Sequence, residues 1–327
     1  MPDRFAESKL SGDEKGVGVG KYAEPSRTEV LRSLAIANGY RTWQPTVTAT
    51  GWRSHGLTHR TLGQGGAPRV AEEFLLASRM KRGDGRVQDS TRPYFSDSGL
   101  RAVSLIECEP APPDRIVGLP QSLPLGKPLE EAMAARRSRR QYAAQPLELA
   151  ELATILRTAC GISGRSRVRL NGGGEVSLPL HTAPTGGGLC PVEVHVLPLR
   201  VTTLDDVAYR FDRRGEVLVR SEVSHSARGV LDTCISPPDR AHMADAGAVL
   251  IMVGRPWRTM RKYGSRGLRF MFLEAGAITQ NAHLAAEALG LGSVECGSLC
   301  DDELHELLGV DGLLQTYVHA VIVGRKG

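Results

Sequence analysis

The chain has 327 residues, a formal net charge of +5 and 41% hydrophobic residues, so it can bury a large core in one domain with an extension, or in two domains. Aromatic residues make up only 5% and the positive excess is small, which argues against a nucleic-acid-binding protein. No apolar segment has transmembrane length and none forms a signal core near residue 1. The sequence therefore predicts a soluble, cytoplasmic protein that does not insert into a membrane.

The six cysteines include no C-x-x-C pair. Cys296 and Cys300 are close in sequence, but no matching histidine or cysteine pair accompanies them. We therefore expect reduced thiols, several of them buried, and no metal site.

The first 127 residues differ in composition from the rest. Residues 1–25 are rich in Gly, Lys and Glu and predict a disordered tail. The segment GVGVG (16–20) looks like a nucleotide loop, but no strand precedes it. Residues 26–127 predict an N-terminal extension with one short helix over 26–38, ending in a proline-rich connector over 109–127.

Residues 128–327 show a mixed α and β pattern that indicates the principal domain. Helical spacing of apolar residues predicts three helices, over 128–133, 146–160 and 268–289. Short β-branched runs predict five strands, over 192–201, 207–211, 216–219, 246–254 and 317–324. The fold class is α+β, and the pattern does not distinguish parallel from antiparallel pairing.

Residues 136–142, RRSRRQY, place four arginines around a serine between two predicted helices. Guanidinium groups and a hydroxyl at such a corner suit an anion, above all a phosphate. A solvated basic corner is the other interpretation, and for this segment alone it is the more common one.

Two later segments favour the phosphate. HTAPTGGGLCP (181–191) puts three glycines ahead of a predicted strand, where backbone groups can approach a flat ligand closely. FLEAGAITQNAHLAAEALGLG (272–292) follows, with a small-residue helix face. In this order, and with the lead-in segments 70–99 and 116–125, the motifs resemble those of the nitroreductase-like FMN oxidoreductases. The resemblance is greatest to the SagB-type azoline dehydrogenases of thiazole/oxazole-modified peptides and covers about residues 70–327.

The resemblance implies a nitroreductase-like FMN-binding sandwich, in which a central mixed or antiparallel sheet is flanked by helices and the long helix lies at a homodimer seam. It implies that the FMN phosphate is held by Arg136, Ser138, Arg140 and Arg325. It implies that the flavin ring lies on Pro184, Thr185, Gly186 and Gly187, with backbone groups of Gly290 and Gly292 closing over it. Cys190 departs from the family pattern, which usually has histidine or tyrosine at that place.

Lys262 and Tyr263 are the catalytic residues that the resemblance implies. Oxidation of a thiazoline removes a proton from the carbon beside the imine nitrogen and a hydride from the ring. A tyrosine is a poor base near neutral pH, but an adjacent ammonium favours the phenolate. Because Gly264 follows directly, we expect a helix to end there and to release both side chains into one cleft. Without the resemblance, a surface helix end is the simpler interpretation.

The sequence thus predicts an FMN-dependent dehydrogenase that oxidises thiazoline or oxazoline rings in a ribosomally made peptide. Its expected partners are the azoline-containing precursor peptide, cyclodehydratase subunits and a second copy of the chain. One alternative is an NAD(P)H-dependent reductase of a small quinone or nitro compound. A second is a flavin-free scaffold subunit of a peptide-modifying complex.

Overall fold

The computed structural model describes residues 74–80, 111–169 and 175–327 of the protein. The chain divides into two units, 1–73 and 74–327, and every described residue belongs to the second. The predicted tail over 1–25, the predicted helix over 26–38 and most of the lead-in segment 70–99 lie outside the described residues.

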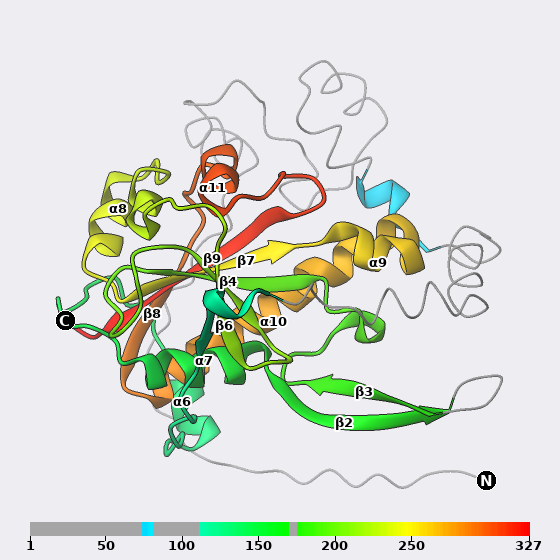
Figure 1. Ribbon diagram of the computed structural model, residues 1–327, viewed down its shortest axis with the longest axis horizontal. Helices are drawn as coiled ribbons and strands as arrows, with labels where there is room; N and C mark the ends of the chain where they lie inside the picture. Colours follow the sequence, from blue (N-terminus) through cyan, green and yellow to red (C-terminus); the bar gives the residue numbers. More distant parts are fainter. Residues whose placement is uncertain (1–73, 81–110, 170–174) are drawn as a thin grey trace, which may run out of the picture. The chain divides into compact units, whose positions relative to one another are not determined.

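A seven-stranded sheet runs through the centre of the described unit (Figure 1). Its strand order is β1-β6-β5-β4-β7-β9-β8, and every neighbouring pair is antiparallel. The strands are β1 (Ile116–Gly118), β4 (Val192–Pro198), β5 (Tyr209–Asp212), β6 (Val217–Arg220), β7 (Ala248–Gly254), β8 (Leu291–Cys296) and β9 (Thr316–Arg325). The predicted α+β sandwich is therefore confirmed, and its sheet is antiparallel.

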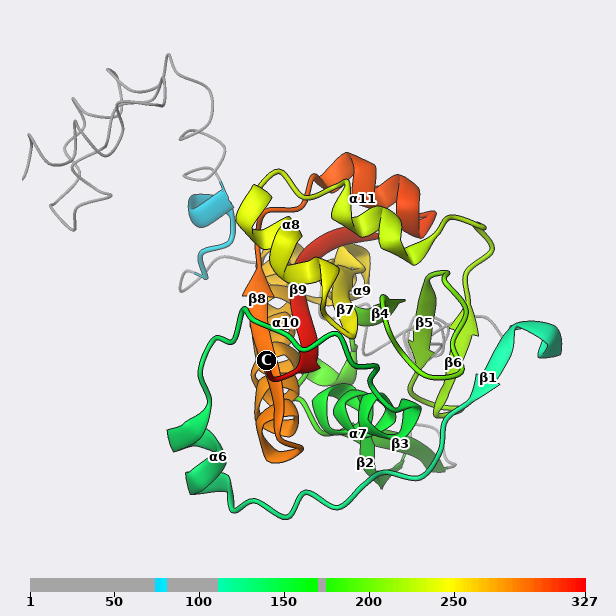
Figure 2. The same cartoon turned by 90° about the vertical axis from the view of Figure 1, so that its left-hand side faces the viewer.

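Helices cover both faces of this sheet (Figure 2). On one face, α7 (Leu149–Cys160) and the long α10 (Gly267–Ala288) pack on the side of β4 that carries Val192 and Val194. On the other face, α8 (Pro237–Ala244) and α11 (Asp301–Leu308) enclose a second apolar cluster. Strand β7 is buried on both faces, as its unbroken apolar run predicts.

Three strand predictions and the long helix agree closely with the structure. The predicted strands over 192–201, 246–254 and 317–324 are β4, β7 and β9, and the helix over 268–289 is α10. The predicted strands over 207–211 and 216–219 form the antiparallel hairpin β5–β6. Ala275, Ala282 and Ala286 are buried on α10, which confirms its small-residue face as a packing surface.

A separate two-stranded hairpin, β2 (Ile162–Arg169) and β3 (Glu175–His181), was not predicted. It follows α7 directly and leads into the glycine segment 186–188 (Figure 1). The sequence of β2, ISGRSRVR, has few apolar residues, so it lacks the usual strand signal.

The end of the proline-rich connector crosses the outside of the domain before α6 (Leu129–Ala135). Its strand β1 pairs with the edge strand β6. Farther along, the Leu123 backbone N–H donates to Thr154 Oγ1 at 2.8 Å, and Arg157 Nη1 donates to the Pro120 carbonyl at 2.5 Å. Among the described residues, no helix combines the length and apolarity needed to cross a membrane.

Candidate active site

Helix α9 (Pro256–Tyr263) carries Lys262 and Tyr263 in its last turn. It ends at Gly264, whose φ of 54° lies in the left-handed region that glycine adopts readily. The prediction that the helix stops there is confirmed, and it explains how two adjacent side chains reach the same place.

Both side chains lie against Gly187. A Cβ built on Gly187 would be 2.5 Å from Tyr263 Oη and 2.7 Å from Lys262 Nζ, closer than real Cβ contacts come. Gly187 also has a φ of 66°. The phenol oxygen and the amine therefore converge on one backbone position that only glycine can occupy without displacing them.

Lys262 is buried, and burial lowers the pKa of its amine because the charged form loses water. Its Nζ lies 5.2 Å from the centroid of the Tyr263 ring. The Tyr263 ring in turn meets Phe270 of α10 edge to face, with centroids 4.9 Å apart. Phe270 also lies under the loop, since its Cβ is 3.1 Å from a Cβ built on Gly186. These contacts fix the pair against α10.

The loop over 184–188 offers backbone rather than side chains to its surroundings. Pro184, Gly187 and Gly188 are exposed, and Gly188 has a φ of 72°. Thr185 is turned inward, where its Oγ1 accepts a hydrogen bond from the Cys190 N–H at 2.9 Å. This hydrogen bond stabilises the loop, while Gly187 and Gly188 expose their backbone on its surface.

Glu274 of α10 lies beneath this loop with a fully buried carboxylate. Burial raises the pKa of Glu274, and the opposing charge of Arg213 is smaller in effect. Glu274 Oε1 accepts a hydrogen bond from the Val192 N–H at 3.3 Å, and Arg213 donates to the Val192 carbonyl. Arg258 Nε donates to the Leu189 carbonyl at 2.8 Å. Sequence reasoning did not assign a role to either arginine.

The arginine corner lies against the beginning of β8. Helix α6 ends before Arg136. Ser138 then forms an isolated parallel β-bridge with Ser293, and the Arg139 N–H donates to the Ser293 carbonyl at 2.9 Å. Arg136 is half-buried, and Ser138 and Arg140 are exposed. The sequence segment therefore forms an accessible basic corner on the main sheet.

The glycines predicted to close over the flavin lie at the same corner. Gly290 has a φ of 76° and leads into β8. A Cβ on Gly292 would be 3.1 Å from the Arg139 Cβ, so Gly292 lets the corner approach the strand. Ser293 is buried, and its Oγ is 2.7 Å from His283 Nδ1 of α10.

Arg325 ends β9 opposite Leu291, at this same edge of the sheet. Its guanidinium pairs with Glu151 of α7 at 2.8 Å. Arg325 thus lies near the arginine corner, but its guanidinium is paired with a residue of α7. Its contact with a phosphate stays a prediction.

The two parts of the predicted site lie at opposite ends of α10. Phe270, near the beginning of the helix, contacts the glycine loop, and His283, near its end, contacts the corner strand. Thirteen residues of helix separate them, which is roughly 20 Å at a rise of 1.5 Å per residue.

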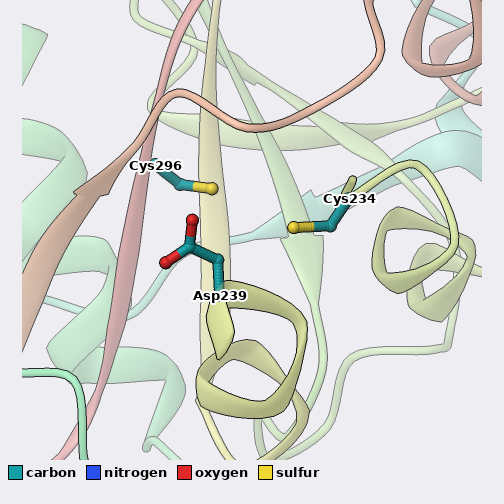
Figure 3. Close-up of side chains that lie close together, drawn as sticks. All are labelled: Cys234, Asp239 and Cys296. Atoms are coloured by element: carbon teal, nitrogen blue, oxygen red, sulfur yellow. The ribbon is translucent and has the colours of Figure 1, made fainter. Parts of the chain in front are cut away.

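A third group of side chains was not expected to meet. Cys234, Asp239 and Cys296 bring their sulfur and carboxylate atoms within 4.8 Å of one another (Figure 3). The Ser298 hydroxyl donates to Asp239 at 2.7 Å and lies 3.3 and 3.4 Å from the two sulfurs. Because this hydroxyl already partners all three, we assign the group a structural role.

Comparison with known proteins agrees with the fold. The nitroreductase family model matches residues 133–325. A protein of Methanocaldococcus jannaschii that bears the name of a nitroreductase is 31% identical over 185 residues, which are 56% of this chain and 84% of that protein.

Two solved structures share the fold. A nitroreductase-like protein of Anabaena variabilis has a TM-score of 0.52 and 21% identity, with 65% of this chain covered and only 42% of that one. A chain of the Escherichia coli microcin synthetase McbBCD complex, solved with truncated pro-MccB17 bound, has a TM-score of 0.50 and 16% identity; 84% of this chain and 99% of that chain are covered. The match over most of the described domain shows that the chain belongs to the nitroreductase family of flavin-dependent oxidoreductases.

Proposed function

We propose that the protein is an FMN-dependent azoline dehydrogenase, which oxidises thiazoline or oxazoline rings of a ribosomally made peptide to thiazoles or oxazoles. The observation that carries this proposal is the convergence of Lys262 Nζ and Tyr263 Oη on the Gly187 backbone. A base and a cation meet there beside an open glycine surface, which is what removal of a ring proton next to a flat hydride acceptor requires.

The side chains and backbone of the predicted site suit both the phosphate and the ring of FMN. Arg136, Ser138 and Arg140 supply guanidinium and hydroxyl donors for a phosphate at an accessible corner. At Gly188 no atom lies within 4 Å of the place where a Cβ would stand, so a flat ring can approach the exposed backbone there. FMN, when bound, supplies the acceptor for the hydride.

Tyr263 takes the proton from the carbon beside the imine nitrogen in this proposal. Lys262 is placed to stabilise the phenolate, since its amine lies beside the phenol ring and against the same glycine. Burial lowers the pKa of Lys262 and so brings its proton exchange closer to neutral pH. The edge contact with Phe270 keeps the ring from turning away.

A homodimer would complete the site. Because the corner and the glycine loop lie at opposite ends of α10, a second copy packed antiparallel along this helix would bring the corner of one protomer beside the loop of the other. Exposed apolar side chains are available for such packing. Phe272 and Leu273 of α10 are 49% and 70% exposed, and Leu129 and Met133 of α6 are 66% and 58% exposed.

The microcin synthetase likeness supports a peptide substrate and partner subunits. That structure is a complex solved with a truncated precursor peptide, and this chain matches nearly the whole length of one of its chains. We therefore propose an azoline-bearing precursor peptide as the substrate and cyclodehydratase subunits as partners.

The redox half of the proposal is tested by mixing the purified, FMN-loaded protein with an azoline peptide under anaerobic conditions. The flavin absorption should bleach as the ring is oxidised and return when air is admitted. An azoline peptide that leaves the flavin oxidised would contradict the proposal.

An NAD(P)H-dependent reductase of small quinones or nitro compounds is the second candidate. The name of the Methanocaldococcus jannaschii relative favours it. In that case NADPH would bleach the flavin within seconds and the azoline peptide would not. A colourless protein that does not take up FMN would instead indicate a scaffold subunit.

A further inference from the structure

Helix α9 bonds to the backbone of segment 187–191, which contains the exposed glycines. The Arg255 N–H, at the N-cap of the helix, donates to the Pro191 carbonyl at 2.6 Å. Arg258 Nε donates to the Leu189 carbonyl at 2.8 Å, about one turn farther along the helix. Together the two hydrogen bonds fix which turn of α9 lies beside which residue of the segment.

Lys262 continues the face of α9 that carries Arg258. It follows Arg258 by four positions, the spacing at which two helical side chains lie on one face. Lys262 Nζ and Tyr263 Oη meet the segment at Gly187, two residues before the carbonyl that Arg258 holds. The place where the amine and the phenol meet the loop therefore depends on the register that Arg258 sets.

The backbone between these contacts is strained. Cys190 has a φ of 45°, which residues other than glycine rarely adopt. Its N–H donates to Thr185 Oγ1 at 2.9 Å, the carbonyl before it accepts from Arg258, and the carbonyl after it accepts from Arg255. Such a conformation persists only where its surroundings hold it, and Arg258 supplies one of these bonds from a side chain.

Other elements hold the end of the segment at Val192. Its N–H donates to Glu274 Oε1 of α10 at 3.3 Å, and its carbonyl accepts from Arg213. Burial raises the pKa of Glu274, and the positive charges of Arg213 and Arg258 oppose this rise. The segment is thus anchored to α10 and to the turn between β5 and β6, and Arg258 joins α9 to this anchored backbone.

We propose that Arg258 is a positioning residue of the reaction, which sets the register of α9 against the glycine segment and so holds Lys262 and Tyr263 at Gly187. The proposal rests on the azoline chemistry proposed above, because that chemistry gives Lys262 and Tyr263 their roles. Arg258 acts through the Leu189 carbonyl, and a small displacement of a base is enough to slow proton transfer.

Glutamine and methionine separate the hydrogen bond of Arg258 from its charge. Arg258→Gln keeps a nitrogen on Cδ, where arginine carries Nε, so it can still donate to the Leu189 carbonyl. Arg258→Met has a similar length and no donor. Every other contact of the guanidinium is lost in both variants, so their difference reports on the Nε position alone.

Steady-state oxidation of an azoline peptide by the full-length, FMN-loaded protein is the first measurement. Arg258→Met should lower kcat at least about tenfold and change KM less than about threefold, because it displaces the base and leaves substrate binding intact. Arg258→Gln should recover most of the lost kcat.

Tyrosine labelled with carbon-13 at Cζ gives a second measurement that needs no substrate. The resonance that disappears in Tyr263→Phe belongs to Tyr263. It should move in Arg258→Met and keep the parent position in Arg258→Gln. If the parent oxidises no azoline, the proposed function fails, while this resonance still decides whether Arg258 positions the phenol.

Arg261→Met is the matched control, since it removes an exposed arginine of the same helix and should behave as the parent in both measurements. If Arg258→Met does not fold, Arg258→Lys replaces it. Lysine keeps the charge but carries its donor one atom farther from the backbone, so this variant should be slower than Arg258→Gln. Equal losses of kcat in Arg258→Gln and Arg258→Met, or an unmoved Tyr263 resonance in Arg258→Met, would overturn the proposal.

Discussion

Lys262 Nζ lies 2.7 Å from the point where a Cβ would stand on Gly187, 75 positions earlier in the chain. Tyr263 Oη lies 2.5 Å from the same point. This relationship joins the end of α9 to the glycine loop and brings a phenol oxygen and an amine together at exposed backbone. The first three predictions depend on it.

Tyr263→Phe removes the phenol oxygen and keeps the ring that packs on Phe270. We expect bound FMN and thermal stability to be retained, because the edge contact remains. Azole formation should fall by ~10²–10⁴-fold, the usual contribution of a placed base. Steady-state rates and the flavin-to-protein ratio are measured together. A variant that oxidises the peptide at the parent rate, or one that loses flavin in proportion to activity, would exclude the proposed role.

Lys262→Ala should move the pH dependence of activity upward. Activity through a phenolate rises with pH, and loss of the neighbouring positive charge disfavours the phenolate, so the rising limb shifts to higher pH. Burial lowers the pKa of Lys262, so the parent loses this assistance at a lower pH than an exposed lysine would. Rate profiles between pH 6 and about 10 test the shift, and an unchanged midpoint would argue that Lys262 acts otherwise.

Gly187→Ala should impair the site more than Gly188→Ala does. Both glycines have positive φ, 66° and 72°, so alanine costs each roughly 1–2 kcal/mol of backbone strain. Only at Gly187 does the added Cβ meet the side chains of Lys262 and Tyr263; at Gly188 no atom lies within 4 Å. Unfolding free energies should therefore fall similarly, while turnover falls further for Gly187→Ala. Equal turnover in the two variants would mean that Gly187 has no particular role in the reaction.

The arginine corner should hold FMN. Arg136→Ala with Arg140→Ala removes two charge-assisted contacts, each worth roughly 1.5–3 kcal/mol, so FMN affinity should fall at least ~10²-fold while the fold persists. Arg137→Ala is the matched control, since its guanidinium donates to the Ala134 and Arg136 carbonyls at 2.8 Å. Flavin fluorescence titration measures both. Unchanged FMN affinity in the double variant would mean that the FMN phosphate is bound elsewhere.

Regular apolar patterns predicted the central strands and the long helix, but not α8 and α11, which cover the second face of the sheet. Strands β4, β7 and β9 and helix α10 could be located because their residues face the core with periods of two or 3.6. Strand β8 was missed, because Gly290-Leu291-Gly292 after a helix is typical of a helix end and the strand follows without a loop. The hairpin β2–β3 was missed because β2 is polar and packs little on the core.

The candidate site could be predicted in its parts but not in its geometry. The motifs pointed to Lys262, Tyr263 and the glycine loop, yet spacing along the chain does not reveal that they touch. Glu274 gave only a weak signal, an acidic residue on the small-residue face of a long helix. The pairing of Arg325 with Glu151 depends on side-chain directions that a sequence pattern does not contain.

The most direct test is mass spectrometry of an azoline-bearing peptide incubated with the FMN-loaded protein and air. The account predicts that the peptide loses the mass of two hydrogen atoms for each ring, and that Tyr263→Phe largely abolishes this loss while retaining its flavin. A peptide of unchanged mass, after incubation with protein that holds FMN and is exposed to oxygen, would contradict the account.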